Sequence, residues 1–521
     1  MALLGALLAA AWGQYLWTGL PRIALDLAPG AAPLEFPAWL RLAHYLNFIF
    51  LILLARSGLS ILMDHPRLYA NDHCTPGTEW LRFTPVQVPE GQQYTAKEDA
   101  RYISPWVALP GYRHTIGMAR HWHFLPALLW FLNGAIFIAL LFGTGQWRRI
   151  VPGSWSILPD AWNVFVHYAT FHIPPKPEIL HAYNPLQQLS YFAVVFVLAP
   201  LSFLTGLAMS PSIVNRFPWY ARIFGGRQGA RSVHFILLLS YLAFLIGHVA
   251  MVSVTGLAGN MNRIVLGAHD GGWLGAALGV AGIASVAGIC WLAHWTAWTH
   301  PRPMQYVVQT IHNRVMRRLL FKHLDPRGEY SREDISPFFW PNGKVPASEE
   351  WRALAAGDFR GFRLKVSGLV ANPVELSIDE LKALGKQEQI TMHHCIQGWS
   401  GIAQWGGLPM AKLVELVRPD PEARVCVFRS FGEGLYGGEY YDTQRLDNVL
   451  HKQCLLSYEM NYQPLESLYG APLRLRVENQ LGYKMVKWIR SIEFVASEKD
   501  VGEGHGGKNE DDEYFDLIPD I

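Results

Sequence analysis

The sequence predicts an all-α transmembrane helical bundle followed by a C-terminal α+β domain that is rich in strands. Five apolar stretches within the first 300 residues are long enough to cross a bilayer. Beyond residue 336, short apolar runs alternate with Gly/Pro turns, a pattern typical of half-buried strands. Over all 521 residues, 50% are hydrophobic and 17% are charged, which is low in charge for a purely soluble protein. The bundle therefore has five core spans, or six if the extreme N-terminus also crosses.

The membrane domain is predicted to occupy residues 1–300. Its core spans are expected at residues 37–62, 124–146, 188–210, 232–256 and 273–298. The sixth candidate, residues 1–20, has neither a basic n-region nor a small-residue cleavage site. We therefore expect an extra helix there, with a cleaved signal peptide as the alternative.

The chain changes character after residue 300. A basic linker over 301–335 precedes the strand-rich domain, predicted at 336–497, and the acidic run within 498–521 predicts a flexible acidic tail. The five cysteines include no CxxC pair, which excludes zinc ribbons, thioredoxin chemistry and c-type haem attachment. A net charge of +2 gives no bias toward nucleic acid, so no nucleic-acid partner is expected.

Basic residues are distributed unevenly among the predicted loops. They concentrate after the first and third core spans and in the linker, which all lie on one side of the membrane. Loops rich in Lys and Arg stay in the cytoplasm. We therefore expect a multi-pass protein of the inner (cytoplasmic) membrane whose soluble domain faces the cytoplasm.

Four histidines lie in or at the ends of the predicted spans: His44, His123, His234 and His248. Ionisable groups in spans are costly and usually functional. His234 and His248 share one span, about 21 Å apart along the helix and only about 40° apart in direction. Because successive spans alternate in direction, His123 shares a depth with His234, and His44 with His248. The pattern predicts two bis-imidazole sites for two b-type haems, the alternative being four interfacial helix-end residues.

Cys395 stands directly after His393 and His394, and Trp399 and Trp405 follow it. A thiolate can bind a soft or high-valent metal. A lone cysteine beside two histidines also fits a nucleophile or a buried core residue. The residues alone leave these three readings open.

The membrane half resembles the cytochrome b561 and hydrogenase b-type cytochrome group. The carrying motifs, spread over residues 37–300, are Arg41-x-x-His44, Arg120-x-x-His123-Phe124, Asn133-Gly134, and Arg231-x-x-His234 with the downstream His248. The resemblance implies that these histidines ligate two haems, which pass electrons between quinone and a partner.

The soluble half resembles the sulfite-oxidase-fold molybdopterin oxidoreductases, especially the methionine-sulfoxide reductase catalytic subunits. The carrying motifs include Cys395-Ile-Gln-Gly-Trp399-Ser400, Trp405-x-Gly407-x-Pro409, Gly470-Ala-Pro472-Leu-Arg474 and Gly482-Tyr-Lys484-x-Val-Lys487-Trp488. The resemblance implies that Cys395 binds molybdenum beside the pterin. It assigns contacts with the pterin or its phosphate to Asn342, Ser430, Arg474, Met485, Val486 and Lys487. Sulfite oxidases carry two arginines shortly after the cysteine, where this chain has Gln397, Gly398 and Trp399.

These features together predict a membrane-bound, molybdopterin-dependent oxidoreductase. It would couple two-electron oxygen-atom chemistry on a small substrate, preferably reduction of an S- or N-oxide, to electron transfer through two b haems. The predicted partners are membrane lipid, the small-molecule substrate, and quinone or a redox partner protein. One alternative is an oxidase of sulfite or another small molecule that feeds electrons to quinone. Another is a transmembrane haem electron-transfer protein whose soluble domain is a non-catalytic docking module.

Overall fold

The computed structural model describes residues 2–23, 36–89, 94–112, 116–174, 183–268, 272–312, 330–517 and 519–521. The chain divides into two compact units. Unit 1 comprises Met1–Ile52, Pro126–Leu204 and His234–Cys290, and unit 2 comprises Leu53–Leu125, Thr205–Val233 and Trp291–Ile521. The predicted domain limits remain predictions, and most of the predicted basic linker, 313–329, lies outside the described residues.

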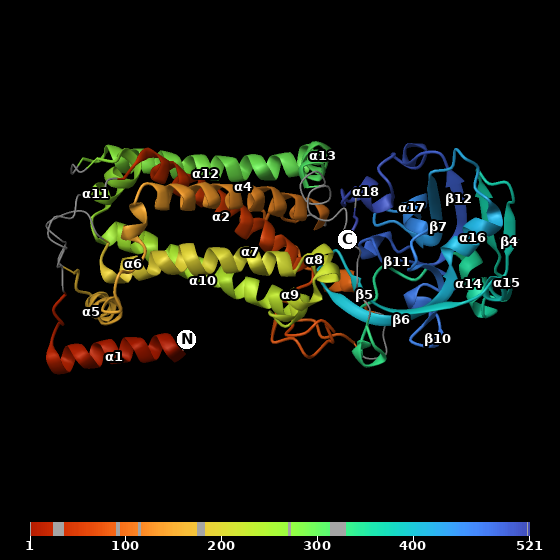
Figure 1. The fold of residues 1–521 in the computed structure, drawn as a ribbon, viewed down its shortest axis with the longest axis horizontal. Coiled ribbons are helices and arrows are strands. Elements are labelled where there is room, and N and C mark those ends of the chain that lie inside the picture. Colours follow the sequence, from red (N-terminus) through yellow and green to blue (C-terminus); the bar gives the residue numbers. More distant parts are fainter. Residues whose placement is uncertain are drawn as a thin grey trace. The chain divides into compact units, whose positions relative to one another are not determined.

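The part of the chain that the structure describes has five helices long and apolar enough to cross a membrane, as predicted. They are α2 (Ala38–Asp64), α4 (Ile116–Gly143), the run α6–α7 (Pro185–Ala208), α10 (Gly226–Val254) and α12 (Leu274–Thr299). Their unit 1 parts run side by side (Figure 1). The third span is composite: α6 (Pro185–Phe192) passes through a π-helical stretch, Ala193–Leu198, into α7 (Ala199–Ala208). Asn184 begins it, because its side chain accepts from the Gln187 amide and Pro185 has no amide to satisfy.

The N-terminal stretch is a helix, α1 (Ala2–Thr18), as predicted. It packs against α5 (Ile157–Ala169), where the Trp162 indole donates to Gln14 at 2.7 Å. Its 17 residues extend about 26 Å, slightly less than the roughly 30 Å of bilayer hydrocarbon. A short helix, α11 (Leu257–Met261), follows α10.

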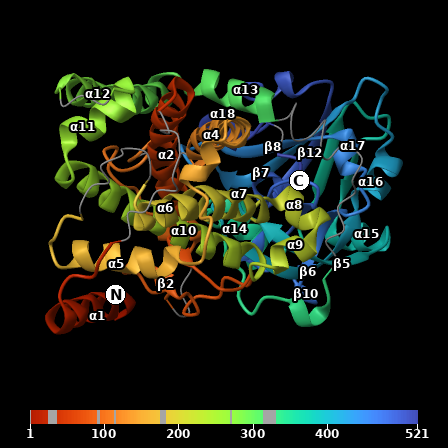
Figure 2. The same ribbon diagram turned by 60° about the vertical axis from the view of Figure 1, so that its left-hand side comes forward.

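Unit 2 contains two five-stranded sheets. The strands of the first sheet are β5 (Gln387–His394), β6 (Ser400–Pro409), β9 (Cys454–Met460), β10 (Gln463–Pro464) and β11 (Arg474–Val477). Their order is β10-β9-β6-β5, and β11 also pairs with β9. All of these pairs are antiparallel. The second has the order β4-β3-β12-β7-β8; its strands are β3 (Leu364–Gly368), β4 (Val374–Leu376), β7 (Val425–Glu433), β8 (Glu439–Arg445) and β12 (Ile489–Val495). Figure 2 shows β7, β8 and β12 as neighbouring arrows. This confirms the predicted strand-rich domain.

The strands and three short helices enclose one apolar core. The helices are α14 (Glu349–Ala356), α15 (Ile378–Ala383) and α16 (Met410–Val417). Leu413 of α16, Phe428 of β7, Leu456 of β9 and Ile492 of β12 are all buried in it. Each such side chain stabilises the fold by about 1.5–3 kcal/mol. The core fixes both sheets and therefore the turns at their ends.

The segment between α2 and α4 also belongs to unit 2. It holds a small hairpin, β1 (Arg67–Leu68) with β2 (Leu81–Arg82), and the short helix α3 (Ala96–Asp99). The Arg67 guanidinium is buried and paired with Asp99 at 2.8 Å and Glu79 at 2.7 Å. These ion pairs tie the segment together. The other short helices of unit 2 are α8 (Pro211–Arg216), α9 (Pro218–Arg222), α13 (Pro301–His312), α17 (Leu446–Val449) and α18 (Lys508–Asp512).

Residues 498–521 differ from the predicted flexible acidic tail. They carry α18, and Glu510 of that helix is buried against Lys484, with Nζ 2.6 Å from Oε1. Asp442 pairs with the same ammonium. Acidic composition suggested a solvated tail, but a buried lysine provides a partner that composition cannot reveal.

Candidate functional site

Cys395 occupies the turn between two paired strands. β5 ends at His394 and β6 begins at Ser400, so the cysteine is the first residue of the connection. The Cys395 amide donates to the Trp399 carbonyl at 3.2 Å, and the Gly398 amide donates to the Cys395 carbonyl at 3.1 Å. Gly398 has φ +110°, a conformation that favours glycine. The sequence at this turn therefore fixes the position of the thiol.

The Cys395 sulfur is enclosed. The residue is 3% exposed, and two side-chain polar atoms, the Asn342 amide nitrogen and the Gln397 amide oxygen, each lie 3.9 Å from Sγ. Burial raises the pKa of the Cys395 thiol to about 12. Such a thiol stays protonated by itself, whereas a bound metal cation replaces its proton. The structure thus brings the predicted residue Asn342 to the predicted metal ligand.

Two cations, the buried Arg474 and the half-buried Lys487, form no ion pair among the described residues. Arg474 donates only to the Tyr469 carbonyl, at 3.0 Å, and its Nε has no partner there. Lys487 donates to the Leu468 carbonyl at 3.0 Å. Burial and neighbouring Arg476 lower the pKa of Arg474 to about 9, and burial with Arg474 places the pKa of Lys487 well below its usual range. A phosphate would supply the missing negative charge.

The remaining predicted pterin contacts lie beside this pair. The Ser430 hydroxyl donates to the Lys487 carbonyl at 2.7 Å and accepts from the Gly432 amide at 2.9 Å. The side chains of Met485 and Val486 belong to the apolar core. Met485 and Val486 can therefore contact a ligand only through their backbone atoms. The Ser430 hydroxyl is already hydrogen-bonded to the Lys487 carbonyl.

Sequence reasoning did not assign the aromatic lining of the site. Trp399 and Trp405 are buried, and both indole nitrogens lack a hydrogen-bond partner in the described parts of the chain. Leaving such a donor unsatisfied costs about 1–3 kcal/mol. A molybdenum-bound pterin has ring acceptors and a phosphate, so these donors and cations fit it. The tryptophans following the cysteine were visible in the sequence, but their unsatisfied nitrogens were not.

The first turn of α10 reaches the same turn of the sheet. The Gln228 amide group donates to the Gly398 carbonyl at 2.8 Å and to the Ser400 hydroxyl at 3.1 Å. The Ser400 hydroxyl in turn donates to the Asp72 carbonyl at 3.0 Å. Residues from two stretches of unit 2 that are distant in sequence, around Asp72 and Gln228, thus support the cysteine turn.

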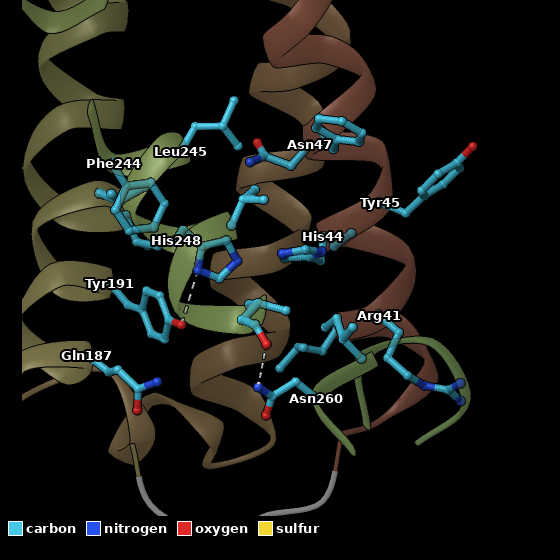
Figure 3. A pocket seen from close by; sticks show the side chains of 18 of the residues that line it. Arg41, His44, Tyr45, Asn47, Gln187, Tyr191, Phe244, Leu245, His248 and Asn260 are labelled. Carbon is cyan, nitrogen blue, oxygen red and sulfur yellow. Dashed lines mark hydrogen bonds between the residues drawn. The ribbon is translucent and has the colours of Figure 1, made fainter. Parts of the chain in front are cut away.

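A second candidate site lies within unit 1, where His44 of α2 and His248 of α10 point toward one another (Figure 3). Their ring centroids are 6.2 Å apart. A metal–imidazole bond is about 2 Å long, so one metal ion and two such bonds fit between the rings. The Tyr191 hydroxyl lies 3.4 Å from His248 Nδ1, a contact drawn in Figure 3 that orients the ring.

His44 and His248 line a cavity of about 1910 Å³. This exceeds the roughly 300–1,000 Å³ of an ordinary small-ligand pocket. The described part of the lining is mainly apolar; it includes Arg41, Arg149 and Arg263, and none of its described residues is an aspartate or glutamate. A large apolar macrocycle with acidic edge groups, such as a haem, matches this lining.

The other two predicted haem ligands belong to different units, so their pairing stays a prediction. His123 Nδ1 lies 3.1 Å from the Ser57 hydroxyl. The neighbouring His121 is buried, and its Nε2 lies 3.1 Å from the Tyr514 carbonyl.

Two family models match this chain. Residues 35–267 match Prokaryotic cytochrome b561, and residues 353–501 match the Oxidoreductase molybdopterin binding domain. A relative from Azospira oryzae, YedZ1, described as a protein-methionine-sulfoxide reductase subunit, is 36% identical over 27% of this chain and 51% of its own. The protein-methionine-sulfoxide reductase catalytic subunit MsrP of Xanthomonas campestris is 32% identical to this chain over 25% of this chain and 44% of its own length. The MsrP of Ralstonia nicotianae is 29% identical over 31% of this chain and 51% of its own length. The chain therefore spans about half the length of these relatives.

Proposed function

Because this chain joins a cytochrome b561 membrane domain to a molybdopterin oxidoreductase domain, we propose that it reduces a small S-oxide with electrons from a quinol. The S-oxide takes two electrons and two protons and yields a thioether and water. Oxidation of one quinol to quinone supplies two electrons and releases two protons. A redox partner protein is the other source of electrons compatible with this arrangement. The relatives whose descriptions name methionine-sulfoxide reductases favour an S-oxide over other oxides.

The observation that carries the proposal is the buried Cys395 thiol in a site with the buried Arg474 and the half-buried Lys487, neither of which forms an ion pair among the described residues. Cys395 would bind the molybdenum, and Arg474 and Lys487 would hold the pterin phosphate. Asn342, Ser430 and the backbone of Met485 and Val486 would complete the cradle. When bound, the cofactor supplies two-electron oxygen-atom transfer; the protein holds and orients it.

In the membrane part, His44 and His248 would hold one b haem, and His123 and His234 would hold a second. Neutral imidazoles are ordinary haem ligands, and haems transfer single electrons. Two such groups would divide the electron pair of a quinol into single steps toward molybdenum.

The side of the membrane is part of the same proposal. The basic loops, which include Arg82, Lys97, Arg101 and Arg216, would stay in the cytoplasm together with the molybdenum domain. Fusion of alkaline phosphatase or green fluorescent protein to the C-terminus tests this. Fluorescence without phosphatase activity is expected, and the opposite result would reverse the orientation.

The test of function is a metal and optical assay of the full chain purified with its native cofactors. We expect one molybdenum and two b haems per chain, and reoxidation of the reduced haems by methionine sulfoxide. Haem reduction by sulfite without reoxidation by any S-oxide would establish the oxidase alternative. Haem without stoichiometric molybdenum would establish the docking-module alternative.

A further inference from the structure

His65, the residue directly after α2, is completely buried. It is 0% exposed, and neither Nδ1 nor Nε2 has a hydrogen-bond partner among the residues that the structure describes. Buried polar groups in native proteins are nearly always satisfied. An imidazole with both nitrogens unsatisfied therefore indicates a ligand or water that completes the site.

A second unsatisfied group lies beside it. Tyr69 is also 0% exposed, and its hydroxyl has no partner within the described ranges. The rings of His65 and Tyr69 stack at 5.9 Å with an interplanar angle of 19°. Two polar side chains from one short segment thus share a buried location.

That location adjoins the Cys395 turn. Tyr69, Trp340, Cys395 and Trp399 pack in one cluster of buried side chains. His65 contacts Trp340 edge to face, with centroids 5.2 Å apart. A hydrogen bond also links the two segments, because the Gln397 side chain donates to the Asp64 carbonyl at 3.4 Å. Segment 65–74 therefore forms part of the wall around the predicted metal ligand.

The backbone of this segment is held without using the His65 ring. Arg231 donates to the carbonyls of His65 and Arg67, each at 2.7 Å. The Trp340 indole donates to the Cys74 carbonyl at 2.7 Å. Because other groups hold the segment, the imidazole and the Tyr69 hydroxyl are available to a ligand.

Both groups are neutral donors. Burial, with Arg231, Arg67 and Arg227 nearby, places the pKa of His65 well below its usual range, so the ring is uncharged at neutral pH. Burial raises the pKa of Tyr69, so its hydroxyl keeps its proton. Neutral donors suit the polar but uncharged oxygen of an S-oxide, and the ring of Trp340 offers an apolar surface to its organic groups.

We propose that His65 and Tyr69 are substrate-binding residues of the molybdenum site, where they donate hydrogen bonds to the oxygen of the S-oxide. This rests on the proposed function. The segment after the first core span would then bind the substrate together with the strand-rich domain. Specificity for the substrate would come partly from the membrane half of the chain.

The test compares His65→Leu and Tyr69→Phe with a matched control in the full chain loaded with its cofactors. The control is His73→Leu, because His73 lies on the same segment but its Nδ1 already contacts the Ser336 hydroxyl at 3.1 Å. Reduced viologen serves as the electron donor, and methionine sulfoxide as the substrate. Molybdenum content and the Mo(V) paramagnetic spectrum, with and without dimethyl sulfoxide, are measured in parallel.

We expect kcat/KM to fall about tenfold in each of the two variants, as loss of one hydrogen bond to the substrate predicts, with unchanged molybdenum content. The spectral change induced by dimethyl sulfoxide should disappear in these variants and persist in His73→Leu. Unchanged kcat/KM in both variants would overturn the proposal, because water would then be the partner. Loss of molybdenum from His65→Leu would overturn it as well, because the ring would then contact the cofactor.

This experiment distinguishes failure of the proposed function from failure of the proposed roles of His65 and Tyr69. Wild-type protein that turns over no S-oxide would refute the proposed function. A dimethyl sulfoxide response present in the wild type and absent in the variants would still support His65 and Tyr69 as the binding groups.

Discussion

Arg227 donates hydrogen bonds to the carbonyl oxygen of Gly398 and to that of Trp399, each at 3.1 Å. Arg227 lies in the first turn of α10, and Gly398 lies in the turn that begins with Cys395. A third bond from Arg227, to the Met209 carbonyl at 3.0 Å, fixes the guanidinium. The start of a membrane-type helix thus holds the peptide groups beside the predicted molybdenum ligand.

Replacement of Arg227 by Met should loosen this turn. Each of the two buried carbonyls would lose a charged donor, and such a hydrogen bond contributes about 1.5–3 kcal/mol. The bonds from Gln228 to the Gly398 carbonyl and from the Cys395 amide to the Trp399 carbonyl would remain. We expect a lower thermal unfolding temperature and a broadened Mo(V) spectrum. Arg222→Met, on the exposed side of α9, should change neither. A variant as stable as the control, with a sharp spectrum, would show that Arg227 does not hold the turn.

Cys395→Ser should abolish oxygen-atom transfer. Loss of a group that only supports a ligand costs about 10–100-fold, so loss of the sulfur itself should cost more than about 100-fold in kcat. The Mo(V) spectrum should change because the metal loses its protein sulfur. Cys426→Ala is the control, since this thiol is buried in the apolar core. Retention of both the rate and the spectrum in Cys395→Ser would refute the metal-ligand assignment.

Most of the architecture was predictable because a bilayer and a strand each impose a simple pattern. The five spans follow from the length of apolar sequence that a membrane requires, and β3 follows from the alternation of buried and outward-facing residues over Leu364–Gly368. Cys395 was predictable because its neighbours form a recognisable motif. In each case the evidence lies within a few consecutive residues.

His65 and Tyr69 could not be predicted in the same way. They lie more than 300 positions before Cys395 in a segment without periodicity. Their unsatisfied nitrogens and hydroxyl are properties of packing. Arg474 and Lys487 show the same limit, because they lie at positions that alternate like solvent-facing residues. Only the fold shows that Arg474 is buried, that Lys487 is half-buried, and that neither pairs with a carboxylate among the described residues.

His44→Ala and His248→Ala should each remove the same haem. Their rings face one another across 6.2 Å, so one metal needs both. We expect the haem content to fall by the same amount in either variant and in the double variant. The pyridine haemochrome assay measures this, with His172→Ala as the control because His172 contacts Thr170 in the connection after α5. Additive losses in the double variant would show that the two histidines serve different haems.

Loading of the pterin cofactor should depend on pH through Lys487. Burial and Arg474 lower the pKa of this ammonium. A bound phosphate raises that pKa, so binding takes up a proton. Affinity should therefore be highest below the lowered pKa and fall as pH rises from there toward the pKa of the occupied site. Molybdenum uptake by cofactor-free protein across a pH series measures this. Lys487→Met should load less cofactor and lose the pH dependence, whereas a retained slope would assign the proton to another group.

Lys484→Met should unfold the strand-rich domain at lower temperature. Lys484 is buried between Asp442 and Glu510, and burial raises the pKa of both carboxyl groups. Removing the shared cation from a buried ion pair costs about 3–5 kcal/mol, because the carboxylates stay behind without a counter-charge. Lys382→Met is the matched control, since Lys382 and Asp379 form an exposed pair at 3.9 Å. Such a surface pair contributes at most about 1 kcal/mol. Equal melting temperatures for the two variants would show that α18 and the residues around it do not stabilise the domain through Lys484.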